Sequence, residues 1–474
     1  MKKLIRILYI ILFTYILLVV FFSNNKTYLS FREPFIIKNI IIGLIIIIPI
    51  LVLRKTSKKI TDKNYKKILI ISSIIAFVIQ LVILRCTYFY TDWDVKTIRD
   101  IITNNDLIHN YYLTKYPNTL VYLAILKFYY SIPILGKYYF PLLIINALLV
   151  NISSIIASLT IKRFTNNFNA LLGYYILFFL TVLSPWINIP YSDTFTVILP
   201  IPIIYLYTKK EKNNKDLFFI GFLSILGYYL KPTVFIVFIA ITIIYMIDLI
   251  IKKTKIDLKV LFIIFIGIIS SFVSCKIAVK LTGFKPYPYT NSFGIIHYLA
   301  MGQNNDYYGL FNEKDVYESD KYGRSHDLKK AFNRIKERKI KDHLNFLEVK
   351  TLLNFNDGTF AWGLEGEKFY YKVLAPKDKI SKSFQDYFYL NHKNNYLFKI
   401  FMQTIWLFVL ILSLFAGITK DNNKYSIIYL SLIGLILFLT LFECRARYLY
   451  CYSPVFVTAA MIGLDNLKKL KKGK

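Results

Sequence analysis

Cysteines and acidic residues are scarce in this sequence, and internal repeats are missing. Each shortage makes certain classes of protein less probable. The four cysteines (Cys86, Cys275, Cys444 and Cys451) include no closely spaced pair of the kind that binds a metal ion, so free thiols are expected. No repeat of the type found in many secondary transporters is visible. The basic and then apolar N-terminus lacks a small-residue cleavage site, which predicts a retained signal anchor instead of a cleaved signal peptide.

Long apolar runs are what the chain has in abundance. Hydrophobic residues make up 56% of the 474 positions, and a run such as residues 36–53 carries almost no charge. A run of about 18 or more apolar residues is long enough to cross the bilayer as a helix. The sequence therefore predicts an all-α polytopic membrane protein.

Basic residues outnumber acidic ones by 60 to 28, which gives a formal net charge of +32. A charge of this size can indicate nucleic-acid binding, so its distribution along the chain decides between explanations. The segments that two cytoplasmic termini place inside contain 27 Lys and Arg residues, whereas the short segments placed outside contain 10. Because basic loops stay in the cytoplasm, the charge reflects membrane topology, and nucleic acid is not predicted as a partner.

About twelve crossings satisfy this charge distribution. They are predicted at residues 4–22, 35–53, 67–84, 139–160, 170–184, 196–208, 217–230, 233–251, 260–280, 396–417, 425–442 and 455–467. Residues 98–134 are predicted to form juxtamembrane helices in the outer leaflet, because one more crossing there would put the two termini on opposite sides.

Three regions follow from this topology. Residues 1–280 form an N-terminal transmembrane module with an acidic outer loop at 85–118, and residues 396–474 form the C-terminal transmembrane helices. Between them, residues 281–395 are less hydrophobic and form one large extracytoplasmic loop domain. Apolar residues at helical spacing over 328–347 predict an amphipathic helix there, which rests either on anionic lipid headgroups or on the rest of the loop.

The stretch RCTYFYTDWDVKTIRD, residues 85–100, places the carboxylates of Asp92 and Asp94 where a predicted membrane helix meets water. A carboxylate in this position can take the proton from an attacking hydroxyl. His109 is a further candidate base, although a single loop histidine is more often structural or solvated. The alternative for the acid pair is structural, because acidic residues favour helix N-termini and would cap the helix that follows.

Three more segments on the predicted outer side carry charge. PYSDTF contains Asp193, GYYLKPT contains Lys231, and ECRARYLY contains Arg445 and Arg447. Charged side chains at membrane depth cost about 2.5–3.5 kcal/mol, so they usually have a partner or a role. Lys and Arg gathered with carboxylates suit a phosphate, which Arg can bind through two hydrogen bonds, together with a hydroxyl.

In their order along the chain, these motifs resemble those of GT-C fold glycosyltransferases, in the branch that includes protein O-mannosyltransferases, aminoarabinose transferases and many Gram-positive surface-glycan enzymes. The resemblance covers most of the chain. It rests on the acid pair Asp92 and Asp94, a Tyr116-Pro117 element, the PYSDTF stretch with Tyr191, the Lys231-Pro232 turn and the arginine-rich ECRARYLY. Within the long loop, HYLAMGQNNDYYGLFNEKDV and NFNDGTFAWGLEGE are similar to segments of the Gram-positive members.

The resemblance implies an inverting, multi-pass enzyme of the cell membrane whose active site is extracytoplasmic. Its partners would be a polyprenyl-phosphate sugar as donor, a cell-envelope glycan such as teichoic acid or a wall polysaccharide as acceptor, and membrane lipids. By resemblance, Asp92 is the base, and Asp94 either orients the acceptor or shares a cation. The donor phosphate would be bound by Lys231, Arg445 and Arg447, with support from Asp193, His109, Tyr116 and Tyr191.

Enzymes of this kind differ in their need for a metal, since some use a divalent ion and others use none. Two or three basic residues are available here to neutralise a single phosphate. No metal or other cofactor is therefore expected, and a divalent metal is the alternative.

Three other functions fit parts of the pattern. A flippase or transporter of lipid-linked sugars would also need outer cations, but it would more often carry charges deep within helices and inverted repeats. A polymerase or ligase of lipid-linked glycans also uses outer arginines, but such enzymes usually place their main site in a late loop. A non-catalytic scaffold would need neither acid.

Overall fold

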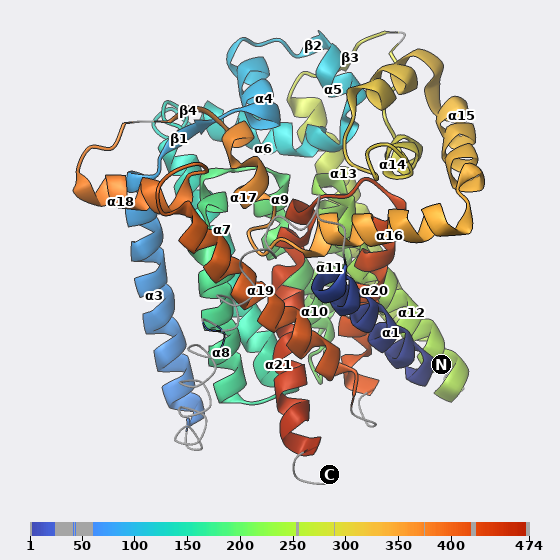
Figure 1. The fold of residues 1–474 in the computed structure, drawn as a ribbon. Helices are drawn as coiled ribbons and strands as arrows, with labels where there is room; N and C mark the ends of the chain where they lie inside the picture. The colour runs from blue at the N-terminus through green and yellow to red at the C-terminus, as the bar shows by residue number, and fades with distance from the viewer. Residues whose placement is uncertain are drawn as a thin grey trace.

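The computed structural model describes residues 2–23, 41, 43, 60–252, 256–288, 290–373, 375–418 and 423–470. Within these ranges the chain is mainly helical. Long helices form a bundle, and short helices, loops and two small strand pairs form a layer at its upper end (Figure 1).

Six helices among the described residues are long and apolar enough to cross a membrane. They are α1 (Lys2–Phe22), α3 (Asp62–Cys86), α7 (Phe140–Phe164), α12 (Phe235–Lys252), α13 (Leu258–Leu281) and α19 (Asn395–Ala416). The bundle also contains shorter helices, namely α8 (Asn167–Leu177), η3 (Phe178–Val182), α9 (Ser192–Phe195), η5 (Thr196–Ile198), α10 (Pro200–Tyr207), α11 (Asn214–Leu230), η6 (Pro232–Val234), η8 (Asn423–Tyr425), α20 (Ser426–Leu441) and α21 (Ser453–Leu470).

These helices coincide with the predicted crossings wherever the structure describes them. The crossing predicted at residues 35–53 lies outside the described residues, apart from residues 41 and 43. The six long helices match six of the predicted crossings. That the shorter helices also cross, which the count of about twelve requires, stays a prediction.

The upper layer comes mainly from two stretches of the chain. The first contains β1 (Phe89–Thr91), α4 (Trp93–Thr103), β2 (Ile108–Asn110), α5 (Tyr111–Lys115), η2 (Pro117–Thr119) and α6 (Leu120–Ser131). The second contains β3 (Lys285–Pro286), α14 (Ile295–Gly302), α15 (Glu313–Glu337), α16 (Ile340–Phe355), α17 (Trp362–Glu365), η7 (Gly366–Phe369), β4 (Tyr370–Val373) and α18 (Lys379–Phe388). Two short segments from elsewhere in the chain, η4 (Pro185–Asn188) and the turn η9 (Ala446–Tyr452), lie beneath them. Antiparallel pairing of β1 with β4 and parallel pairing of β2 with β3 join the predicted outer loops to each other.

Charges that the sequence places on the cytoplasmic side meet at helix ends. Lys2 in α1 pairs with Asp248 near the end of α12 at 2.5 Å, and Lys162 at the end of α7 pairs with Asp62 at the start of α3 at 3.0 Å. The side chain of Thr61 caps α3 by accepting a hydrogen bond from the third backbone N–H of the helix. These contacts fix the ends of neighbouring helices at the same level of the bundle.

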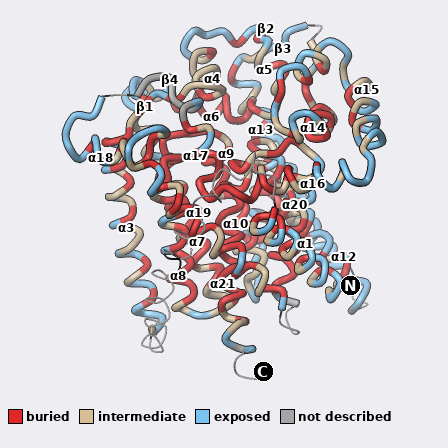
Figure 2. Tube along the Cα trace, viewed as in Figure 1, coloured by how far each residue is buried: buried red, intermediate tan, exposed pale blue. Residues whose placement is uncertain are grey.

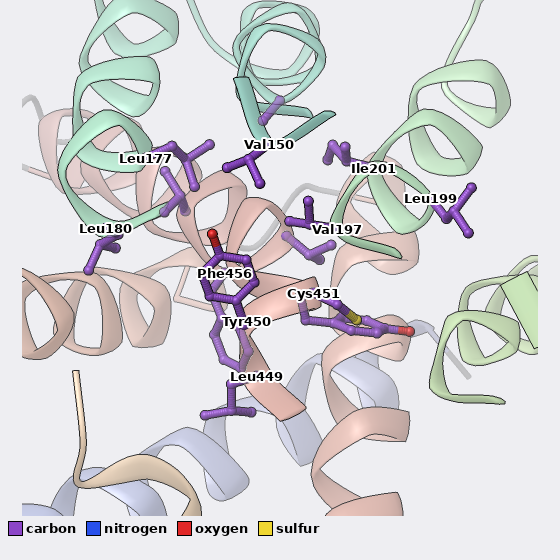
Figure 3. Close-up of a cluster of buried hydrophobic side chains, with 14 of the residues drawn as sticks. Val150, Leu177, Leu180, Val197, Leu199, Ile201, Leu449, Tyr450, Cys451 and Phe456 are labelled. Atoms are coloured by element: carbon purple, nitrogen blue, oxygen red, sulfur yellow. The ribbon is translucent and has the colours of Figure 1, made fainter. Parts of the chain in front are cut away.

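The buried core runs through the middle of the bundle and continues beneath the upper layer (Figure 2). Figure 3 shows part of it, where Tyr450 and Cys451 of η9 lie among Val150, Leu177 and Val197 of the surrounding helices. All three residues Leu449, Tyr450 and Cys451 are fully buried. Their packing anchors η9, and η9 in turn positions the arginines at its start.

Helices α11 and α13 cross so closely that each contributes a glycine to the contact. A Cβ on Gly221 would overlap the carbonyl oxygen of Ile264, and a Cβ on Gly267 would overlap that of Phe218. Small residues that let two backbones approach are typical of helix interfaces in membranes. This contact positions the end of α11, from which Lys231 follows.

The helix predicted over residues 328–347 is two helices in the structure. α15 ends at Glu337 and α16 begins at Ile340. Arg338 causes the break, because its guanidinium donates hydrogen bonds to the backbone and side-chain oxygens of Gln303 at 2.8 and 2.9 Å and lies over the ring of Phe346. These contacts hold the backbone of Arg338 in an extended conformation that a continuous helix could not accommodate.

The glycine contact gives a stability prediction. Gly267→Ala is expected to lower the stability by about 1–3 kcal/mol, because the new methyl group must push α13 away from the α11 backbone. The measurement is the thermal unfolding midpoint of the purified protein in detergent. Gly294→Ala is the matched control, since a Cβ there makes only ordinary contacts with Arg324. Equal midpoints for the two variants would contradict the close crossing.

Candidate functional site

A cavity of about 910 Å³ lies where the helix bundle meets the upper layer. Its walls come from distant parts of the chain, with residues from 93–119, 191–193, 230–233, 297–314, 365–368 and 438–448. Its charged residues are Asp94, Asp193, Glu313, Glu365, Glu443, Lys231, Lys314, Lys368, Arg445 and Arg447. The cavity therefore combines carboxylates with cations, as the sequence predicts for this side of the molecule.

Asp94 enters the cavity from the first turn of α4. Tyr112 donates a hydrogen bond to one of its carboxylate oxygens at 2.8 Å, and Tyr191 donates to the other at 2.9 Å. Burial, followed by the charge of Asp94, raises the pKa of both tyrosines well above the usual value, so both hydroxyls keep their protons and act as donors. The two bonds fix the orientation of the Asp94 carboxylate, and each oxygen retains a lone pair for a ligand.

Asp193 lies between two cations at the floor of the same cavity. It pairs with Lys231, and its second oxygen lies 3.8 Å from Nε of Arg447. All three residues are at most 8% exposed. A buried charge is costly unless it is compensated, and here one carboxylate faces two cations, which leaves this group with an excess positive charge.

The Arg447 guanidinium has donors to spare. Its Nε and Nη1 atoms, and Nε of Arg445, are buried without a hydrogen-bond partner among the described residues. Burial acts to lower the pKa of Arg447, but Tyr448, Asp193, Glu365 and Glu443 raise it above the usual value, so the side chain stays charged. Buried donors on a cation are the expected feature of an anion-binding site.

Trp93 forms the surface on which this guanidinium lies. The Arg447 Cζ atom is 4.1 Å from the centre of the indole ring. Trp93 has a φ of +66°, a left-handed backbone conformation that is unusual for a bulky residue. This conformation directs the chain from β1 into α4, so that Trp93 and Asp94 both reach the cavity.

The second arginine is held by the long loop. Arg445 pairs with Glu365 of α17 at 3.3 Å. A tight turn precedes α17, in which the buried Asp357 accepts backbone hydrogen bonds from Thr359 and Ala361, both at 2.7 Å. Because this turn folds back into the bundle, it delivers Glu365 to the cavity.

The structure brings most of the predicted site residues together. Asp94, Tyr116, Tyr191, Asp193, Lys231, Arg445 and Arg447 all line the cavity. Asp92 and His109 do not. Asp92 is the N-cap residue of α4 and makes no side-chain capping bond, while His109 is exposed and its Nδ1 lies 2.9 Å from the Pro286 carbonyl oxygen.

Several residues of the cavity were not predicted from the sequence. Tyr112, Glu365 and His297 line it, and Tyr448 holds Glu443 through a hydrogen bond of 2.9 Å. Tyr112 lies one helical turn before Tyr116, so the spacing of these two tyrosines was an available signal. Glu365 lies in the NFNDGTFAWGLEGE segment that the resemblance includes, but nothing there marks it as a site residue, because its position depends on the fold of the long loop.

The arrangement of possible metal ligands can be compared with the expectation that no metal is bound. Among them, no group of three or more His, Cys, Asp or Glu side chains has the arrangement of a metal site. The four cysteines are all buried and free.

Comparison with known proteins gives one result. A family model described as conserved hypothetical integral membrane protein matches residues 1–468. No curated protein and no solved structure matches the chain.

The pKa of His297 gives a pH prediction. Burial lowers this pKa to about 4, whereas an unfolded histidine titrates near 6.5. Between these values the unfolded state binds more protons, so stability falls as the pH falls from 6.5 to about 4, by about 3 kcal/mol at most. His297→Gln removes this contribution, and its unfolding midpoint is expected to vary less with pH than that of the wild type.

The comparison of His297→Gln with the wild type isolates the effect of His297 for two reasons. Burial raises the pKa of Asp357 to about 6, which acts in the opposite direction, but this effect is common to both proteins. His109→Gln is the control, because the side chain is exposed. A pH profile of His297→Gln parallel to the wild-type profile would show that His297 does not titrate abnormally.

Proposed function

We propose that this chain, which belongs to the family of conserved hypothetical integral membrane proteins, is a glycosyltransferase that moves a sugar from a polyprenyl-phosphate donor to a cell-envelope acceptor. We place about twelve helices across the membrane and the cavity on the outer face. Teichoic acid or a wall polysaccharide is the proposed acceptor class. The observation that carries the proposal is that one cavity combines an oriented carboxylate with arginine N–H donors that make no hydrogen bond to any described residue.

The lipid phosphate would bind at the positive end of the cavity. Arg447 offers Nε and Nη1, and Lys231 and Arg445 line the same cavity. Charge-assisted hydrogen bonds of this kind are about twice as strong as neutral ones. They would stabilise the negative charge that develops on the phosphate oxygen as the bond to the sugar breaks.

Asp94 would act as the general base. The acceptor hydroxyl attacks the anomeric carbon, its proton passes to the Asp94 carboxylate, and the bond between the anomeric carbon and the phosphate oxygen breaks, leaving both bonding electrons on the polyprenyl phosphate. Attack from the face opposite the leaving group inverts the configuration. This assignment moves the role of base from Asp92, which the resemblance implies, to Asp94, because Asp92 does not line the cavity.

No metal is needed for this scheme, since the cations of the cavity supply the positive charge. A divalent ion bound with the donor stays the alternative. The test is turnover in excess EDTA, with and without added Mg²⁺ or Mn²⁺, and a full loss that only the metal restores would favour the alternative.

The acid pair offers a matched comparison. Asp94→Asn is expected to lower turnover by about 10²–10⁴-fold, because the base is lost, while the donor still binds. Asp92→Asn is expected to keep near wild-type turnover. The measurement is release of polyprenyl phosphate from a panel of polyprenyl-phosphate sugars by the purified protein with cell-envelope extract.

Other results of this experiment would change the assignment. If Asp92→Asn is the inactive variant, the base is Asp92 as the resemblance implies. If both variants match the wild type, the acid loop is structural. If no donor is consumed but labelled lipid changes leaflet, a flippase replaces the transferase.

The phosphate site gives a second prediction. Arg447→Lys keeps the charge but loses the planar pair of donors, so donor affinity is expected to fall by about tenfold. Lys368→Gln removes a charge from an exposed residue of the same cavity and is expected to change affinity less than threefold. Binding of the donor to the Asp94→Asn background measures both values, and a larger loss in Lys368→Gln would place the phosphate at Lys368 instead of Arg447.

A further inference from the structure

A second cavity, of about 750 Å³, opens beside the first at the same end of the bundle. Its walls come from the end of α3, from β1 and α4, from the turn between α6 and α7, and from α18 with the segment before it. The proposed transfer chemistry uses none of its residues.

The lining of this cavity is basic. Arg85, Arg99, Lys137 and Lys377 line it, and no carboxylate does so among the described residues. Two of the cations have acidic partners outside the lining, since Arg85 pairs with Asp378 at 3.3 Å and Arg99 with its neighbour Asp100 at 3.2 Å. Lys137 and Lys377 are exposed. The cavity therefore has a positive surface, which favours an anion.

The lining is also aromatic. Tyr90 and Tyr139 stack with their ring centres 5.8 Å apart, and Tyr88 packs against Tyr90 at 5.3 Å. The Arg99 guanidinium lies 6.0 Å from the centres of both Tyr90 and Tyr139. Flat rings with hydroxyl groups can stack on the apolar faces of sugars and also form hydrogen bonds with their hydroxyls.

One polar group of the lining, the hydroxyl of Tyr130, could form a hydrogen bond with a ligand. The hydroxyl of Tyr130 is buried and has no hydrogen-bond partner among the described residues. Burial raises the pKa of Tyr130 to about 12, so the hydroxyl keeps its proton. A buried hydroxyl without a partner costs free energy, which a ligand with an acceptor oxygen would recover.

The two cavities share one wall. Tyr90 and Arg99 face the second cavity, whereas Trp93 and Asp94, between them in sequence, line the first. Thr91 fixes this wall, because its hydroxyl bonds with the Tyr139 hydroxyl at 2.6 Å and donates to the Asn188 carbonyl oxygen at 3.1 Å. A chain bound in the second cavity would therefore lie next to the element that carries the proposed base.

We propose that the second cavity binds an anionic carbohydrate, a sugar or polyol chain that carries phosphate or carboxylate groups. Its acidic groups contact Arg85, Arg99, Lys137 and Lys377, and its rings or polyol carbons lie against Tyr88, Tyr90 and Tyr139. That this chain is the acceptor of the transfer reaction rests on the proposed function. Binding itself does not.

Direct binding tests the proposal. The full chain is placed in nanodiscs of phosphatidylcholine, and the affinity of a fluorescent glycerol phosphate oligomer is compared with that of maltohexaose, which is neutral. The oligomer is expected to bind, and maltohexaose to bind at least tenfold more weakly. The double variant Arg99→Gln with Lys137→Gln is expected to weaken binding of the oligomer by about tenfold or more.

Matched variants separate this site from general charge attraction. Lys329→Gln with Lys341→Gln removes two exposed charges from α15 and α16 and is expected to change the affinity less than twofold. Lys137→Gln alone alters an exposed side chain and is expected to leave the thermal unfolding midpoint unchanged, so a loss of affinity at an unchanged midpoint reports on binding. Equal losses in the two double variants, or unchanged affinity in Arg99→Gln with Lys137→Gln, would overturn the proposal.

Phospholipid headgroups carry similar phosphates, so a further experiment must distinguish a glycan from a lipid as the ligand. The measurement is repeated in nanodiscs that contain phosphatidylglycerol. If phosphatidylglycerol leaves the oligomer affinity unchanged, the ligand is a glycan. If phosphatidylglycerol weakens oligomer binding to the wild type but not to Arg99→Gln with Lys137→Gln, the cavity binds a lipid headgroup and the proposal is overturned. Asp94→Asn is expected to bind the oligomer like the wild type, so a failed transfer reaction and a failed binding site give different results.

Discussion

The buried contact of Asp193 with Lys231 and Arg447 is the constraint on which the cavity depends. It joins three segments that are distant in sequence, namely α9, the turn after α11 and η9. Removing one member of a buried ion pair typically costs about 3–5 kcal/mol, because the remaining charge loses its compensation. Movement of any one of these segments would therefore break its ion-pair contact with the others. The bundle beneath supports them, with Tyr450 and Cys451 packed below the arginines and the α11–α13 glycine contact below Lys231.

The sequence predicted the helices and the gathering of charges because both have local signals. An apolar run specifies a membrane helix by its length, and the basic loops specify which helix ends lie together, so Asp193, Lys231 and Arg447 could be assigned to one face before their contacts were known. Which of two neighbouring acids enters a cavity has no such signal. Asp92 and Asp94 are separated only by Trp93, and the positive φ of Trp93 turns the backbone so that Asp94 and not Asp92 lines the cavity.

The long loop shows the other limit of sequence analysis. Its turn at residues 357–363 contains Phe360 and Ala361 in the left-handed conformation, with Asp357 bonded to the backbone of Thr359 and Ala361. Trp362 is fully buried and donates to the Phe388 carbonyl oxygen at 2.7 Å, while Trp186 donates to the Thr359 carbonyl oxygen at 3.1 Å. These contacts join residues far apart in the chain, so the spacing of apolar residues in the sequence cannot predict them. The same reason explains why a single amphipathic pattern became two helices, since the break comes from the contacts of Arg338.

Trp93 links the strain of the backbone to the chemistry of the cavity. A left-handed conformation costs an ordinary residue about 1–2 kcal/mol, so a tryptophan keeps it only where other contacts hold it. Arg447, 4.1 Å from the ring centre, supplies such a contact, because a desolvated guanidinium over an indole is worth about 2 kcal/mol or more. The ring covers one face of the guanidinium, while Nε and Nη1 have no hydrogen-bond partner in the described part of the chain. An indole, unlike a carboxylate, holds the cation in place without neutralising it. The one carboxylate beside it, Asp193, is shared with Lys231, so positive charge remains available to an anionic ligand.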